Sequence, residues 1–170
     1  MVKCVIGDDI YYMKKALVEA NKAFKLEEIP IGAIIVYDGK IIGRGYNVRN
    51  FKKNPLGHAE LIAISKASKY IDDWRLENCT MYVTVEPCPM CAGAIVQSRI
   101  KKLVYGCDNP KAGCCGSILN IVHEPKFNHQ VEVLDGVLEK ECSELMKVFF
   151  GGLREKISLL KEKDNNSNIK

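Results

Sequence analysis

The sequence predicts a single α/β domain, built around a mixed five-stranded sheet flanked by helices. Three observations support this fold class. Short β-branched runs alternate along the chain with longer segments in which apolar residues recur at helical spacing. These segments follow the order helix, hairpin, helix, strand, helix, strand, strand, helix. The chain has 170 residues, 47% of them hydrophobic, which suits one domain of ordinary size with a sizeable core.

The N-terminal part predicts a helix followed by a β-hairpin. Apolar residues recur at spacings of three and four over 10–25, which indicates a helix that a preceding aspartate can cap. The β-branched run 33–37 indicates a strand, and 40–46 returns as the second strand after Asp38-Gly39, a strong turn signal. The glycines within 40–46 suggest a bulge or the close approach of a ligand.

The central part predicts a helix, a strand and another helix. A loop over 47–57 leads into a good helix-forming segment at 59–67. A strand follows over 80–85, and then a helix over 90–98. Such strand–helix crossovers predict parallel pairing for the later strands.

The C-terminal part predicts two more strands and a long helix. The strands 103–105 and 130–134 are separated by a loop rich in glycine and cysteine. From Asp135 onward, apolar residues at helical spacing predict a terminal helix that Gly151-Gly152 weakens in mid-course.

Composition and charge narrow the class of protein. We expect residues 1–160 to form one domain and the polar segment 161–170 to be a disordered tail. No run of 18 apolar residues appears and the short apolar N-terminal stretch is unlike a secretory signal, so we expect a cytoplasmic protein without membrane contact. The formal net charge of +4 permits binding to nucleic acid without requiring it.

Two short segments carry the predicted chemistry, His58-Ala59-Glu60 and Pro87-Cys88-Pro89-Met90-Cys91. Zinc takes nitrogen and sulfur ligands tetrahedrally, and a catalytic zinc site keeps its fourth position for water. We therefore expect His58, Cys88 and Cys91 to bind one Zn²⁺. A C-x-x-C pair alone also occurs in redox motifs and structural zinc sites. The joint pattern H-x-E with P-C-x-x-C is the signature of the zinc nucleoside and nucleobase deaminases.

Glu60 gives this predicted zinc site a hydrolytic character. It lies two positions after His58 in the first turn of a predicted helix, so its side chain points away from the ligand. A free carboxylate there can take a proton from water and pass it to a ring nitrogen and then to a leaving amine. This relay is what hydrolytic deamination requires, whereas a structural zinc site has no use for it.

From about Ile10 to Arg154, the chain resembles the bacterial tRNA-specific adenosine deaminases. The segments that carry the resemblance beyond the metal motif are Ile29–Ala33, Pro110–Gly113 with Gly116-Ser117, Asn128-His129 and Phe149-Phe150. The resemblance implies a three-layer, cytidine-deaminase-like fold and zinc-dependent hydrolytic deamination of adenosine to inosine at the wobble position of a tRNA anticodon. It also implies a homodimer that holds the anticodon stem-loop across both subunits, with one Zn²⁺ in each.

The same resemblance implies roles for individual residues. It gives His58, Cys88 and Cys91 as zinc ligands and Glu60 as the proton shuttle. The positions that it implies for substrate binding are Asn47, Ala59, Asn109, Lys111, Phe149 and Arg154. The family usually has an acid where this chain has Asn109, which bears on how well ribose is distinguished from deoxyribose.

Several alternatives stay open at this point. The motif also suits a deaminase of free guanine or cytosine, and a non-catalytic tRNA-binding module would keep the zinc but lose the shuttle acid. Phe149 and Phe150 could pack in the core instead of stacking on bases. Three cysteines of the glycine-rich loop could hold a second metal, although free thiols are the simpler expectation: Cys107, Cys114 and Cys115. Three basic groups could form one track for phosphates: Lys52-Lys53, Arg99 with Lys101-Lys102, and Lys111.

Overall fold

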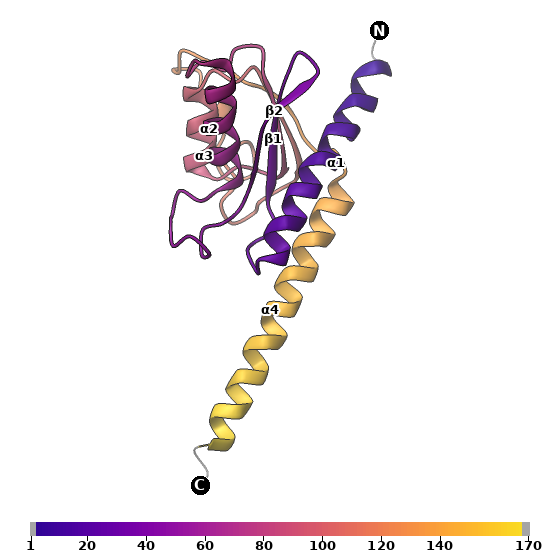
Figure 1. Ribbon diagram of the computed structural model, residues 1–170, viewed down its shortest axis with the longest axis vertical. Coiled ribbons are helices and arrows are strands. Elements are labelled where there is room, and N and C mark those ends of the chain that lie inside the picture. Colours follow the sequence, from indigo (N-terminus) through magenta and orange to yellow (C-terminus); the bar gives the residue numbers. More distant parts are fainter. Residues whose placement is uncertain (1–2, 168–170) are drawn as a thin grey trace.

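The computed structural model describes the backbone of residues 3–167 and the exposure of the side chains of residues 7–161. The helices are α1 (Lys3–Lys25), α2 (Ala59–Ile71), α3 (Pro89–Gln97), the short 3-10 helix η1 (Ile121–His123) and α4 (Glu139–Ser167). The strands are β1 (Gly32–Tyr37), β2 (Lys40–Tyr46), β3 (Thr80–Val85), β4 (Lys102–Cys107) and β5 (Glu132–Leu134). Figure 1 shows three layers, with α2 and α3 on one face of the sheet and α1 and α4 on the other, which confirms the predicted fold class.

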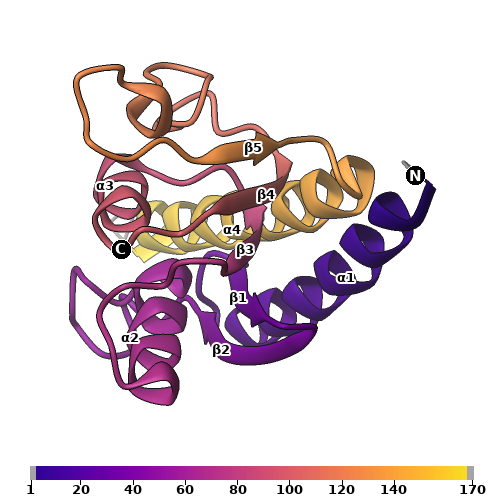
Figure 2. The ribbon, with the colours of Figure 1, turned by 90° about the horizontal axis from the view of Figure 1, so that it is seen from above.

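The sheet is mixed, with the strand order β2-β1-β3-β4-β5 that Figure 2 shows from above. β1 is antiparallel to both β2 and β3, whereas the pairs β3–β4 and β4–β5 are parallel, as predicted. It follows that β2, β3 and β4 all end at the same edge of the sheet. The segments that follow these three strands, and the N-termini of α2 and α3, therefore gather at one end of the domain.

The glycines of β2 let α2 pack directly on the sheet. The register passes from Ile35↔Gly43 to Val36↔Ile41, so β2 contains the predicted bulge. A Cβ atom at Gly45 would lie 2.0 Å from the carbonyl oxygen of Ala59 in α2. The close approach suggested by these glycines is thus made by a helix and not by a ligand, and it places the start of α2 against the sheet.

Two hydrophobic cores hold the layers together, one on each face of the sheet. The core under α2 and α3 includes Met81, Ile95 and Leu103, and all three side chains are fully buried. The core under α1 and α4 includes Met13 and Ile34, which are also fully buried. Apolar side chains therefore cover both faces of the central strands, as expected for a sheet between two helical layers.

The start of α1 differs from the prediction. The helix begins at Lys3, so Asp9 lies inside it and cannot cap its start. Asp9 is instead 2% exposed and accepts hydrogen bonds from the hydroxyl of Tyr82 at 2.7 Å and from Nζ of Lys102 at 3.0 Å. An aspartate before an apolar segment resembles a helix cap in sequence, but here long-range partners stabilise it within the helix.

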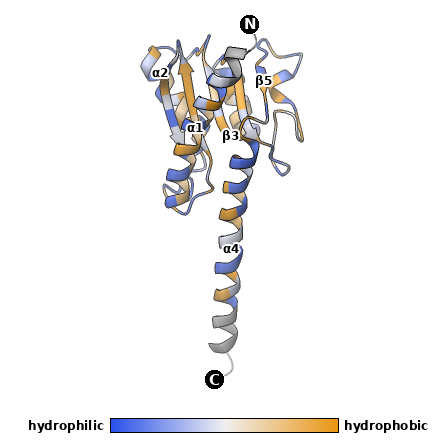
Figure 3. Ribbon diagram, turned by 90° about the vertical axis from the view of Figure 1, so that its right-hand side faces the viewer, coloured by the Kyte–Doolittle hydropathy of each residue, from blue (hydrophilic) through white to orange (hydrophobic). Residues whose placement is uncertain are grey.

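The terminal helix also differs from the prediction. α4 runs without interruption through Gly151-Gly152, and it includes residues 161–167, which we expected to lie in a disordered tail. Residues 168–170 of that predicted tail lie outside the described residues. Figure 3 shows that α4 extends beyond the rest of the domain. Within residues 3–167, no helix has both the length and the apolar character needed to cross a bilayer.

Candidate metal centre and active site

The two predicted metal-binding segments meet at the end of the domain where β2, β3 and β4 terminate. His58 is the N-cap residue of α2, and Cys88 is the N-cap residue of α3, directly after β3. Cys91 lies in the first turn of α3, after Pro89 at the first helical position. Because helix N-termini carry partial positive charge, both helices favour thiolate over thiol at this place.

The distances between the three ligand atoms fit a tetrahedral metal. Nδ1 of His58 lies 3.7 Å from Sγ of Cys88 and 3.6 Å from Sγ of Cys91. Ordinary Zn–N and Zn–S bond lengths at a tetrahedral angle give a nitrogen–sulfur separation of about 3.6 Å. Among the described residues these three side chains form the single group of potential ligands whose atoms lie within 4.8 Å of one another.

The cysteines of the glycine-rich loop do not form a second metal site. Cys107, Cys114 and Cys115 are buried free thiols. Desolvation by burial raises the pKa of Cys107 to about 11, so this thiol stays protonated at neutral pH. These findings agree with the simpler expectation of free thiols.

The protonation of the ligand set is already organised for metal binding. A hydrogen bond from the Cys91 thiol is the largest cause that lowers the pKa of Cys88 to about 4, although burial opposes it. The same hydrogen bond raises the pKa of Cys91, and burial raises it further. Interaction with the Cys88 thiolate raises the pKa of His58. One thiolate is thus present at neutral pH, and metal binding would displace the remaining proton.

Glu60 is the one buried side chain whose polar atom lacks a partner among the described residues. It is 3% exposed, and its Oε2 atom accepts no hydrogen bond. A buried polar group without a partner costs about 1–3 kcal/mol. Burial is also the main cause that raises the pKa of Glu60. The carboxylate lies outside the group of potential metal ligands, and its predicted role in proton transfer stays a prediction.

Asn47 connects the loop after β2 to the start of α2. It is 5% exposed, and its Oδ1 atom accepts a hydrogen bond of 3.0 Å from the backbone N–H of Ala59. This bond holds the first turn of α2, which carries Glu60, and it occupies the Ala59 N–H. The predicted contacts of Asn47 and Ala59 with the base stay predictions, and a contact through Ala59 would have to use another atom.

The other predicted substrate-binding residues lie on separate segments. Asn109 and Lys111 are in the loop after β4, where Oδ1 of Asn109 accepts a hydrogen bond from the N–H of Ala112 at 3.2 Å and Lys111 is exposed. Phe149 and Arg154 are on α4, where Arg154 is exposed and Phe149 is half-buried, with its ring 6.0 Å from that of Phe24. Phe149 therefore takes part in packing, and its contact with RNA remains a prediction.

The three basic groups that could form one track do not lie at one end of the sheet within a single chain. Arg99, Lys101 and Lys102 lie at the amino-terminal end of β4, which is the opposite end of the sheet from the metal ligands. Lys102 is paired there with Asp9. Of the three groups, only Lys52-Lys53 and Lys111 lie on the side of the metal centre, because they belong to the loops that follow the ends of β2 and β4.

Two buried glutamates near the site were missed by the sequence reasoning. Glu28 is 2% exposed, and its Oε1 atom accepts a hydrogen bond of 2.6 Å from the N–H of Phe51 in the loop after β2. Glu86 is also 2% exposed and binds the loop after β4. The one signal for Glu86 in the sequence is its place between an apolar strand and Pro87.

Residues 7–154 match the family model of the MafB19-like deaminases. The chain is 50% identical over 148 residues to the tRNA-specific adenosine deaminase of Bacillus subtilis (strain 168). This alignment covers 87% of this chain and 92% of that protein. The chain is 43% identical over 164 residues to the tRNA-specific adenosine deaminase of Streptococcus pyogenes serotype M1, and this alignment covers 94% of this chain and 96% of that protein.

Solved structures agree with these relatives. One, from biochemical and structural studies of A-to-I editing by tRNA:A34 deaminases, superposes with a TM-score of 0.76 at 38% identity and covers 79% of this chain and 98% of that chain. Guanine deaminase from Bacillus subtilis superposes with a TM-score of 0.55 at 39% identity, over 58% of this chain and 63% of that one. The ligand geometry, the free buried glutamate and these likenesses together show that the chain belongs to the family of tRNA-specific adenosine deaminases.

Proposed function

We propose that this chain converts adenosine to inosine by hydrolytic deamination at the wobble position of a tRNA anticodon, with one Zn²⁺ per subunit. The observation that carries the proposal is the unpartnered carboxylate of Glu60 beside the donor atoms of His58, Cys88 and Cys91. In a purely structural zinc site, no interaction would offset the free-energy cost of burying the unpartnered carboxylate of Glu60. The names of the relatives support adenosine in tRNA as the substrate.

The proposed mechanism assigns the proton transfers to Glu60. His58, Cys88 and Cys91 would hold the zinc ion, which would supply Lewis-acid activation of water. Glu60 takes a proton from that water at Oε2 and delivers it to N1 of adenine, as the oxygen adds to C6. Glu60 then takes the remaining proton from the new C6 hydroxyl and transfers it to the amino group, which leaves as ammonia as the C6–N bond breaks and the C6=O bond of inosine forms. The raised pKa of Glu60 suits a group that must hold a proton between these transfers.

The surroundings of this centre suit an extruded base from a single-stranded loop. Within the described residues, the amide nitrogen of Asn47 donates no hydrogen bond, so it can contact the base or its ribose. We place Lys111 and Arg154, both exposed, near the phosphates of the anticodon nucleotides. Base extrusion is favourable in an anticodon loop because little stacking is lost there.

The proposal includes a cytoplasmic homodimer, with residues 1–160 of each chain as one deaminase domain. Ile118 and Leu119 are large apolar side chains that are 52% and 56% exposed in the loop after β4. A Cβ at Gly93 in α3 would meet no atom within 4 Å, so a neighbouring subunit could approach this helix closely. Size-exclusion chromatography with light scattering tests this part, and a monomer at micromolar concentration contradicts it.

The substrate is tested by incubating the zinc-loaded protein with a tRNA transcript, with free guanine and with free cytosine. Inosine in the transcript is the expected product, and a transcript with guanosine at the wobble position is the matched control. Free guanine is included because a guanine deaminase shares part of this fold at 39% identity. Ammonia released from a free base, with no inosine in the transcript, would overturn the proposal.

A further inference from the structure

Glu86 is a buried acid without a cationic partner among the described residues. It follows β3 directly, is 2% exposed, and precedes the Pro87-Cys88 segment of the metal centre. Its carboxylate forms no ion pair with any lysine, arginine or histidine in the part of the chain that the structure describes. A buried carboxylate needs other hydrogen-bond donors, and all of the donors to Glu86 come from one loop.

That loop is residues 108–119, between β4 and η1. The backbone N–H of Asn109 donates to Oε2 of Glu86 at 3.0 Å, and the N–H groups of Cys115 and Ser117 donate to Oε1 at 2.9 and 3.0 Å. The hydroxyl of Ser117 donates a further hydrogen bond to Oε2. One carboxylate thus ties both ends of the loop to the end of β3.

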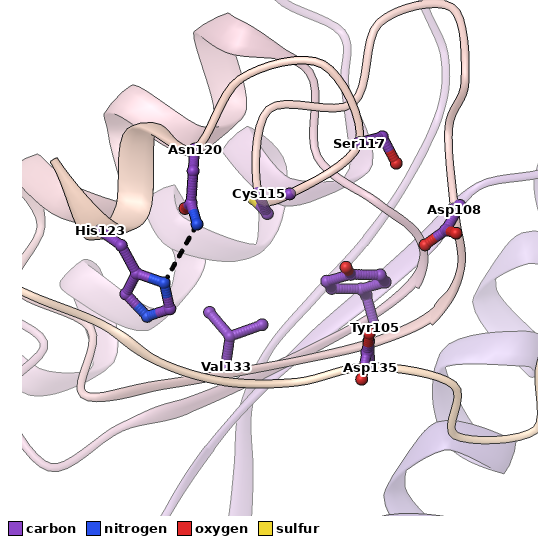
Figure 4. Close-up of a pocket in the computed structure, with 9 residues that line it drawn as sticks. Tyr105, Asp108, Cys115, Ser117, Asn120, His123, Val133 and Asp135 are labelled. Atoms are coloured by element: carbon purple, nitrogen blue, oxygen red, sulfur yellow. Dashed lines mark hydrogen bonds between the residues drawn. The ribbon is translucent and has the colours of Figure 1, made fainter.

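Two close contacts leave this arrangement little freedom. A Cβ atom at Gly113 would lie 2.0 Å from Oε2 of Glu86, so the loop backbone passes directly over the carboxylate. The N–H of Cys114 donates to the carbonyl oxygen of Pro87 at 2.9 Å. The loop is therefore bound at Glu86 and at the next residue, immediately before the metal ligand Cys88. Figure 4 shows Cys115 and Ser117 of this loop around a polar pocket that Tyr105 also lines.

We propose that Glu86 is a positioning residue for the deamination, because it holds the loop 108–119 in register with the metal-ligand segment. The loop carries Asn109 and Lys111, two of the residues expected to contact RNA. The hydrogen bond from the Asn109 N–H to Glu86 sets the place of Asn109, and Lys111 lies between that bond and the contact at Gly113. The position of these side chains relative to the reacting base then depends on Glu86. The kinetic part of this inference rests on the proposed function.

A merely structural role predicts a different result from a positioning role. If Glu86 only stabilises the fold, its replacement should lower stability as any buried glutamate would and leave the kinetic constants unchanged. If it positions the loop, substrate binding should weaken while the metal stays bound. The variant Glu86→Gln separates these cases, because an amide keeps the shape but cannot accept from all the N–H groups that the carboxylate binds.

The first experiment compares Glu86→Gln with Glu19→Gln, both loaded with zinc. Glu19 is the matched control because it is also 2% exposed but lies on α1, on the opposite face of the sheet from α2 and α3. We expect Glu86→Gln to raise KM for an anticodon stem-loop RNA about tenfold or more, with zinc content and kcat little changed. Glu19→Gln should leave KM unchanged. Loss of zinc from Glu86→Gln, or an unchanged KM, overturns the proposal.

The second experiment follows the loop itself by amide hydrogen exchange. Glu86→Gln should accelerate amide exchange within 109–117 and leave exchange in the loop 47–57 unchanged. Ser117→Ala removes one donor to Glu86, so it should accelerate exchange within 109–117 more weakly. Protection of 109–117 that is the same in all three proteins overturns the proposal. If the wild-type protein produces no inosine in RNA, the proposed function fails, whereas exchange still decides whether Glu86 holds the loop.

Discussion

The metal centre and the surface expected to contact RNA are built in opposite ways. His58, Cys88, Cys91 and Glu60 lie on the first turns of two helices, and all are buried or half-buried. Lys111 and Arg154 are exposed and lie on a loop and on α4. The groups proposed for the chemistry thus lie together within one chain, whereas the side chains proposed to contact RNA lie on separate, exposed segments.

This difference predicts that changes in the metal centre should abolish the reaction, whereas changes on the surface should only weaken binding. Preorganised groups act on the transition state, so their loss appears in kcat. Exposed cations contribute modest and salt-dependent energies, so their loss appears in KM. Four predictions test the contrast, from the largest expected effect to the smallest.

The largest effect is expected for Glu60→Gln. The amide cannot take up a proton, so kcat should fall by about 10²–10⁴-fold, the range typical of a lost general acid–base group. Zinc content, measured by atomic absorption, should stay at one per chain because Glu60 lies outside the ligand group. Undiminished turnover would refute the assigned role, and loss of zinc would make Glu60 part of the metal site.

The second prediction concerns Cys88 in zinc-free protein. Its pKa is lowered to about 4, chiefly by the hydrogen bond from Cys91, so it is already thiolate throughout pH 6–8. Its rate of alkylation by iodoacetamide should therefore be nearly independent of pH in that range. An ordinary thiol, with a pKa of about 8.5, gains close to tenfold per pH unit below that value.

Mass spectrometry of the modified peptides measures the rate at each thiol separately. Cys107 serves as the internal control, because burial raises its pKa to about 11 and its rate should rise with pH. Added zinc should protect Cys88. A pH-dependent rate at Cys88, or no protection by zinc, contradicts the ligand geometry.

The third prediction separates the two uses of Asn47. Asn47→Asp keeps the oxygen that accepts from the Ala59 N–H but removes the amide donor expected to contact the base, and its second, buried carboxylate oxygen would lack a donor, which costs about 1–3 kcal/mol of stability. We expect kcat/KM to fall about tenfold, as for one lost hydrogen bond to substrate. Asn47→Ala should also lower the free energy of unfolding, by about 1 kcal/mol, because the start of α2 loses its acceptor.

Urea unfolding and steady-state kinetics on the same preparations distinguish these effects. Equal activity of Asn47→Asp and the wild-type protein would show that the amide donor makes no contact with the substrate. Equal stability of Asn47→Ala would show that the hydrogen bond to Ala59 contributes little to α2.

The smallest effect is expected for Lys111→Ala and Arg154→Ala. Each should raise KM only a few-fold at low salt and should reduce the slope of log affinity against log salt by about one, as for one lost phosphate contact. kcat should be unchanged, because neither side chain lies in the metal centre. A fall in kcat comparable to that of Glu60→Gln would contradict the contrast between the two regions.

The metal centre could be predicted from the sequence because its parts are local. His58 and Glu60 are two positions apart, Cys88 and Cys91 three, and each pair lies where a helix begins, so spacing alone determines their relative directions. The β1–β2 hairpin and the parallel pairing of the later strands also followed from local signals, namely the Asp38-Gly39 turn and the strand–helix crossovers.

The features that were missed depend on contacts between distant parts of the chain. Asp9 was expected to precede a helix but lies inside α1, where Tyr82 and Lys102 stabilise it. The pairing of Lys102 with Asp9 joins β4 to α1 across 93 positions of the chain, so no local pattern indicates it. No local sequence pattern identifies the role of Glu86, because its hydrogen-bond donors lie 23 to 31 positions further along the chain.

The sequence by itself thus determined the fold class and the candidate metal ligands with a candidate acid beside them, since hydrophobic periodicity and helix starts are short-range properties. Only the tertiary structure decided which buried acids hold the surrounding loops and which acid pairs with Lys102. The role of each buried acid depends on how far folding removes its carboxylate from water and on which hydrogen-bond donors folding brings close to it. Both are set by the complete fold and not by neighbouring residues in the sequence.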